Sequence, residues 1–107
     1  MSDATPARLG DLAHSIKGRN AGASWLTFDI GFADEAVYRR VLRSNAITPD
    51  IIAGLYGIPA ADVRIYAFDP AHAIKVTIPR AVAADGLRES DYDGAQQFAP
   101  LLDIEVT

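Results

Sequence analysis

The sequence predicts an α+β domain with a split βαβ core, in which a four-stranded, mainly antiparallel sheet carries helices on one face and an extra helix precedes it. Three patterns indicate this fold: one strongly alternating strand, two consecutive helices after it, and two short β-rich runs that form a hairpin. Half of the 107 residues are hydrophobic, which is enough to bury a core without disulfides. We therefore expect residues 1–107 to form a single domain.

The N-terminal segment predicts a short helix over about residues 9–17, because its apolar residues recur at the spacing of one helix face. Two glycines and an asparagine follow within residues 17–22 and permit positive φ angles, so we expect a loop there. The apolar residues of the helix face are Leu9, Leu12, Ala13 and Ile16.

The clearest strand pattern covers residues 25–32, where the two faces differ in character. We expect the apolar face to contact the helices and Trp25 to point away from them. The apolar face consists of Leu26, Phe28, Ile30 and Phe32, and the other face carries Trp25, Thr27, Asp29 and Gly31.

Two helices should follow this strand. Asp34 can cap the first, whose arginines point away from its apolar stripe. Thr48 and Pro49 predict the start of the second helix, and Gly57 predicts its end. The stripe of the first helix consists of Val37, Tyr38, Val41 and Leu42.

Residues 64–69 and 73–80 predict an antiparallel hairpin, and residues 83–94 are polar and turn-rich, as in a surface loop. Residues 102–106 alternate again and predict the last strand of the sheet. This order of elements is that of ferredoxin-like folds, in which the first and third strands are neighbours. Asp29 and Lys75 should then meet on the face that the helices leave uncovered. We expect another chain to cover that face; the alternative is that the first helix or residues 83–94 fold across it and bury Trp25 within the monomer.

Composition excludes several classes of function. The chain has no cysteine, so it can hold neither a disulfide nor a thiolate-bound metal, and we expect no metal and no cofactor. The net charge of −4 and a third strand without aromatic residues argue against nucleic-acid binding. No apolar run approaches the roughly 20 residues that span a bilayer, so we expect a cytoplasmic protein with no membrane association.

Cations and amides that could bind a carboxylate or phosphate occur in three segments. Residues 17–22 form either an anion site or a turn with solvated charges. Lys75 either contacts a ligand or forms a surface ion pair with Asp29, and Arg80 either borders a site or satisfies nearby carbonyls. The adjacent amides of residues 96–97 recognise a polar ligand or join the loop to the sheet. The candidate substrate-binding residues are Lys17, Arg19, Asn20, Gly22, Lys75, Arg80, Gln96 and Gln97; no catalytic residue is identified.

Several stretches, over about residues 9–106, resemble the bacterial domain-of-unknown-function family 4387. These stretches are residues 17–22, 26–30, 48–57, 73–80 and 94–101. Residues 9–14 are also similar to the opening of the ferredoxin-like C-terminal domain of AtuA-type proteins, which are named for acyclic terpene utilisation. Residues 17–20 depart from the serine, glycine, aspartate and lysine run of those larger proteins.

The resemblance implies a small subunit of a two-component enzyme of the lyase, hydratase or isomerase type. Its partner would be a large AtuA-like protein, and the substrate a carboxylic acid or its CoA ester. Catalytic bases or metals would come mostly from the partner. The alternative is a non-catalytic module that binds a small acid, or that assembles with a partner or a second copy through its open sheet face.

Overall fold

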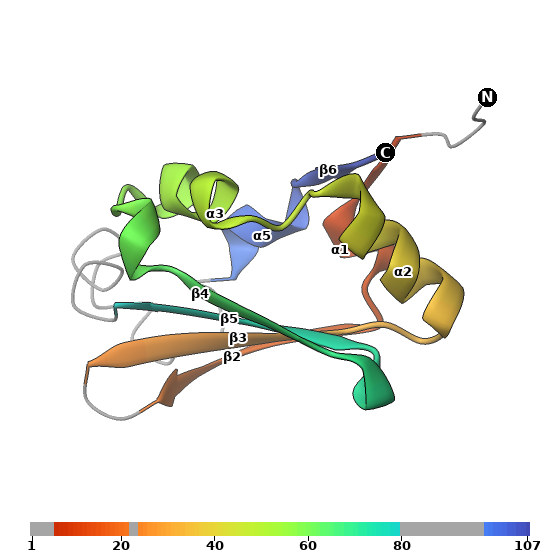
Figure 1. The fold of residues 1–107 in the computed structure, drawn as a ribbon, viewed down its shortest axis with the longest axis horizontal. Helices are drawn as coiled ribbons and strands as arrows, with labels where there is room; N and C mark the ends of the chain where they lie inside the picture. The colour runs from red at the N-terminus through yellow and green to blue at the C-terminus, as the bar shows by residue number, and fades with distance from the viewer. Residues whose placement is uncertain (1–5, 22–23, 80–97) are drawn as a thin grey trace.

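The structure, a computed structural model, describes residues 6–21, 24–79 and 98–107. A four-stranded antiparallel sheet forms one layer, and the α-helices lie on one side of it (Figure 1). The α+β class and the four-stranded antiparallel sheet are confirmed. The order across this sheet is β2 (Ser15–Ala21), β3 (Trp25–Gly31), β5 (Ala73–Pro79) and β4 (Arg64–Phe68).

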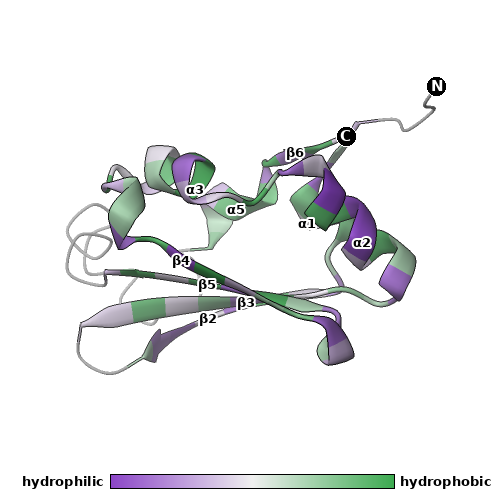
Figure 2. Cartoon of the chain, viewed as in Figure 1, coloured by the Kyte–Doolittle hydropathy of each residue, from purple (hydrophilic) through white to green (hydrophobic). Residues whose placement is uncertain are grey.

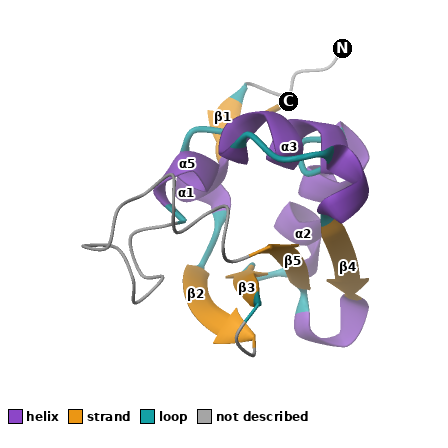
Figure 3. Ribbon diagram, turned by 90° about the vertical axis from the view of Figure 1, so that its left-hand side faces the viewer, coloured by secondary structure: helices purple, strands orange, loops and turns teal. Residues whose placement is uncertain are grey.

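The second layer consists of helices and a small two-stranded sheet that joins the two ends of the chain. The helices are α1 (Leu9–Leu12), α2 (Glu35–Ser44), α3 (Pro49–Tyr56) and α5 (Ala99–Leu102), and the two strands are β1 (Ala7–Arg8) and β6 (Glu105–Val106). Short 3-10 turns, η1 (Ala60–Asp62) and η2 (Asp69–Ala71), precede and follow β4. Figure 3 shows α2 and α3 connecting β3 to β4 across this layer, with β5 between the two strands.

The middle helices begin and end where their sequence indicates. The Asp34 carboxylate accepts a hydrogen bond from the Val37 backbone at 2.9 Å and caps α2. The Thr48 hydroxyl caps α3 in the same way, and Gly57 ends that helix in the left-handed region, at φ 68°. Both predicted helices are therefore confirmed.

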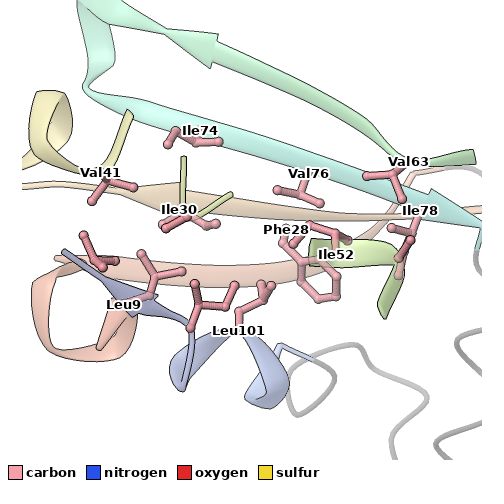
Figure 4. Close-up of a cluster of buried hydrophobic side chains, with 14 of the residues drawn as sticks. Leu9, Phe28, Ile30, Val41, Ile52, Val63, Ile74, Val76, Ile78 and Leu101 are labelled. Atoms are coloured by element: carbon pink, nitrogen blue, oxygen red, sulfur yellow. The ribbon is translucent and has the colours of Figure 1, made fainter. Parts of the chain in front are cut away.

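The hydrophobic core lies between the four-stranded sheet and the helices (Figure 4). The six inward residues of the two central strands are all at most 1% exposed, which confirms the predicted sidedness: Leu26, Phe28, Ile30, Ile74, Val76 and Ile78. Figure 2 shows the alternation along β3 as green hydrophobic residues between paler ones. The Phe28 ring also stacks on Tyr56 from α3, with a centroid distance of 5.7 Å.

Residues 13–21 differ from the prediction of a helix to Lys17 and a loop over residues 17–22. Helix α1 ends at Leu12, and residues 15–21 form β2, which pairs with β3 over its whole length. That prediction is therefore wrong for the described part of the segment. These residues form a strand because the edge of β3, which follows closely in the sequence, offers backbone N–H and C=O groups to pair with. In addition, Gly18 and Asn20 have low helix propensity.

The last strand also differs from its prediction, because it does not join the four-stranded sheet. Residues 99–102 form a helical turn, and β6 pairs with β1. The Leu9 backbone N–H donates to the Ile104 carbonyl at 2.8 Å, and Leu101, Ile104 and Val106 are buried in the core. The free edge of β3 is taken by β2, so the C-terminal segment packs on the helix side of the sheet instead.

A partly buried hydrogen bond joins α2 to the turn after β4. The Tyr38 side chain is fully buried, and its hydroxyl donates to the Asp69 carboxylate at 2.5 Å. Burial raises the pKa of Tyr38 to about 12, and the Asp69 carboxylate adds to this rise. The hydrogen bond from Tyr38 in turn lowers the pKa of Asp69, and the nearby Arg39 guanidinium lowers it further.

We expect Tyr38→Phe to raise the pKa of Asp69 toward its ordinary value of 3.8, because the hydrogen bond from Tyr38 is the largest cause of the depression. A carboxyl group whose pKa is lower in the folded state than in the unfolded state stabilises the fold at pH values above its unfolded-state pKa. This stability is lost as the pH falls through the folded-state pKa. The variant should therefore lose less stability than the wild type on acidification below about pH 4. Carboxyl carbon NMR titration and urea unfolding at each pH measure the two effects.

The matched control is Arg39→Met, which removes the weaker cause and should shift the pKa of Asp69 less. A larger shift in this control than in Tyr38→Phe would contradict the assignment.

Candidate functional site

The sheet face opposite the α-helices, called the open face below, gathers every charged residue of the four strands. Strand pairing places Lys17, Asp29, Lys75 and Tyr66 in one row across the sheet. A parallel row contains Arg19, Thr27, Thr77 and Arg64. Trp25 and Phe68 lie on the same face, in register with Pro79 and Ala73 of β5. The predicted neighbours Asp29 and Lys75 are thus confirmed as directly opposed residues on β3 and β5.

The charge of the open face is opposite in sign to that of the chain. Its strands carry four cations and one carboxylate, a formal +3, whereas the whole chain carries −4. The four cations are Lys17, Arg19, Arg64 and Lys75. The open face therefore has a positive field that favours anionic ligands or acidic surfaces.

The Asp29 carboxylate pairs with Arg19, at 3.0 Å, rather than with Lys75. Arg19 is on the neighbouring strand β2, and its planar guanidinium is the better carboxylate partner. Within the described part of the chain, neither Lys75 nor Lys17 takes part in an ion pair. Of the two alternatives for Lys75, the surface ion pair with Asp29 is therefore wrong, and among the described residues the exposed ammonium of Lys75 is available to an anion.

Three aromatic side chains lie among these cations. Tyr66 and Phe68 are 60% and 61% exposed, which is unusual for large apolar side chains on a regular strand. Trp25 points away from the helices, as predicted, and is half-buried. The Arg64 guanidinium lies over the Trp25 ring, with its central carbon 5.2 Å from the ring centroid. Thr27 is 4% exposed on the same face and shares a 3.0 Å hydrogen bond with Thr77.

Two adjacent hollows lie on the open face, and Tyr66 borders both. The first, of about 540 Å³, is lined by Asp29, Tyr66, Phe68, Ala73 and Lys75. The second, of about 380 Å³, is lined by Ala21, Trp25, Thr27, Arg64, Tyr66 and Thr77. The first hollow is within the size range of small-molecule sites, and Lys75 is the one cation among its described lining residues.

The structure brings together some of the predicted site residues. Lys17, Arg19 and Lys75 share the open face, and the strands of Lys17 and Lys75 are about 10 Å apart on either side of β3. Asn20 has the opposite parity, in register with Leu26, and so belongs to the other face of β2. The remaining four candidates, Gly22, Arg80, Gln96 and Gln97, lie outside the described residues.

Sequence reasoning missed Arg64, Tyr66 and Phe68 as site residues. The signal was present, because these residues alternate with Ile65 and Ala67 along β4. The hairpin prediction for residues 64–69 does not say which face each side chain takes, and the register of β4 with β5 decides it.

Other chemistry has little support in the described ranges. Among residues 6–21, 24–79 and 98–107, no three His, Asp or Glu side chains are grouped so that they could hold a metal ion. None of the described helices has the length and hydrophobicity that crossing a bilayer requires.

The fold and the open face together define an α+β domain with a cationic, partly aromatic sheet surface. A family model described as a domain of unknown function, DUF4387, matches residues 9–105, and the chain belongs to this family. Searches of curated proteins and of solved structures found no match.

Proposed function

We propose that this chain is a non-autonomous small subunit that binds a carboxylate substrate in a site shared with a large AtuA-like partner. The single observation that carries the proposal is the Lys75 ammonium, which forms no ion pair with any described residue and lies beside a hollow of about 540 Å³ on the open face. A lysine ammonium in this position can orient a carboxylate and stabilise negative charge that develops next to it. The reaction would be of the lyase, hydratase or isomerase type, in the cytoplasm.

The partner would contribute the general base or metal. Within the described residues, Asp29 is the one carboxylate in the strands of the open face, and it is held by Arg19. Its Oδ2 oxygen already accepts a hydrogen bond from the Arg19 guanidinium at 3.0 Å, so this oxygen is not free to contact a substrate. This supports a subunit that positions the substrate and depends on a second chain for proton transfer.

The open face also suits a heterologous partner better than a second copy. A face-to-face dimer through it would oppose two surfaces that each carry a formal +3, which is unfavourable. An acidic partner surface would meet the cations and cover the exposed aromatic rings of Tyr66 and Phe68.

The alternative function is a non-catalytic module that binds a small acid or only assembles with the partner, and the same exposed aromatic residues favour it. We further propose that the fold is a variant of the ferredoxin-like arrangement, in which β2 occupies the sheet edge that a last strand would otherwise take. The support is that β3 and β4 flank β5, with α2 and α3 as the crossover.

We expect the chain and its AtuA-like partner to sediment as one complex and to turn over a carboxylate substrate only when both are present. The double charge reversal Lys17→Glu with Arg64→Glu should weaken the complex by at least about tenfold. Each substitution replaces an attraction to the acidic partner surface with a repulsion from it. Trp25→Ala should also weaken it, because this ring is the only tryptophan and lies on the proposed interface.

The matched control is Arg43→Glu on the exposed side of α2, which makes a charge reversal away from the open face and should leave the complex unchanged. A chain that stays monomeric with the partner, or variants that assemble as the wild type does, would refute the shared site. Assembly without turnover would favour the non-catalytic alternative.

A further inference from the structure

The first hollow of the open face has one apolar side and one cationic side. Tyr66 and Phe68 form the apolar side from β4, and Ala73, directly opposite Phe68 on β5, leaves space where a larger residue would fill it. Lys75 lies directly opposite Tyr66. A ligand in this hollow therefore meets two aromatic rings and one ammonium group together.

The spacing of the two rings favours a flat ligand body. Residues i and i+2 on one face of a strand are about 7 Å apart. This separation is roughly twice the carbon contact distance of about 3.5 Å, so a flat group between the two rings can contact both of them. A flat conjugated or aromatic group can contact both Tyr66 and Phe68, whereas a bulky branched group can rest on only one ring. Both rings are more than half exposed, so such a ligand would remove a large apolar area from water.

The charges of the hollow favour one anionic group rather than several. Among the described residues, Lys75 is the one cation in its lining, and the Asp29 carboxylate lines the same hollow. The Asp29 side of the hollow offers a carboxylate whose partner is Arg19 from β2, so a second ligand carboxylate would find no unpaired cation among the residues that line the hollow there.

We infer that this hollow binds a monocarboxylic acid with a flat apolar body, whose carboxylate pairs with Lys75 and whose body packs against Tyr66 and Phe68. The inference rests on the proposed function and deepens it by naming the substrate class. It separates flat monoacids from compact polycarboxylates, which carry charge without an apolar body.

Calorimetric titration of the full chain with trans-cinnamate tests the inference, with backbone NMR shifts to locate the site on β4 and β5. We expect cinnamate to bind saturably, and cinnamyl alcohol, which lacks the charge, and citrate, which lacks the flat body, to bind at least about tenfold more weakly. Adenosine monophosphate, a flat ring with a phosphate, should also bind more weakly, because its ring is polar and its phosphate carries about two charges.

Two variants test the two sides of the hollow separately. Lys75→Met keeps the length of the side chain and removes its charge, and Ala73→Val fills the hollow without changing its charge. Each should weaken cinnamate binding by about tenfold or more. Arg43→Met, which removes an exposed cation from the helix side, should leave the affinity unchanged, and matching unfolding curves would show that the variants are folded.

The outcomes separate this inference from the proposed function. Citrate binding that needs Lys75, without cinnamate binding, would overturn the flat-acid class and leave the carboxylate site standing. Equal affinity for cinnamyl alcohol, or for adenosine monophosphate, would overturn the role of the carboxylate. The absence of binding by every acid, or cinnamate affinity that is unchanged in both variants, would refute the site itself.

Discussion

Phe28→Ala should lower the free energy of unfolding by about 3–5 kcal/mol, which is a large part of the total stability of a domain of this size. Phe28 is fully buried at the centre of β3, and its ring stacks on Tyr56. Removal of the ring loses its burial and leaves a cavity between the sheet and α3, which the rigid ladders to β2 and β5 cannot close. Urea unfolding followed by circular dichroism measures the loss.

The matched control is Phe68→Ala, which removes the same side chain from the opposite face of the same sheet. Phe68 is 61% exposed, so its loss should change the unfolding free energy by less than about 0.5 kcal/mol. A control variant that is as destabilised as Phe28→Ala would show that the two faces are not as different as the structure places them. Phe68→Ala should still weaken binding of a flat acid at the open face.

Leu9→Ala should lower the free energy of unfolding by about 2–5 kcal/mol. Leu9 is fully buried, and its backbone N–H donates to Ile104 where the two ends of the chain meet. The cavity would open between α1 and the C-terminal segment, and it should loosen the pairing of β1 with β6 before the four-stranded sheet unfolds. Hydrogen exchange of the backbone amides would detect this order.

Leu12→Ala is the matched control, because Leu12 is on the same short helix but only partly buried. Its cost should be clearly smaller than that of Leu9→Ala. Equal costs for the two variants, or unchanged amide exchange in β6, would argue that the chain ends do not contribute to the core in this way.

The candidate site was only partly visible in the sequence, because a site depends on which strands become neighbours. Lys75 and Asp29 could be paired in advance, since both lie on strongly alternating strands whose parity is readable. The ion-pair partner of Asp29 is Arg19 instead, because residues 15–21 form an edge strand next to β3. The sequence did not predict this strand, because Ile16 continues the helical spacing of the preceding apolar residues. Tyr66 and Phe68 joined the site only through the register of β4 with β5.

The sequence by itself determined the features that depend on local patterns. These are the buried face of β3 and β5, the capped ends of α2 and α3, and the hairpin of β4 and β5, since periodicity and capping residues act within a few positions of the chain. Only the tertiary structure decided the pairing of β2 with β3 and of β1 with β6. The second pairing brings together the two ends of the chain, where Arg8 contacts Asp103, 95 residues away in the sequence. Such contacts depend on which strand edges remain unpaired once the core has formed, and no local sequence pattern specifies them.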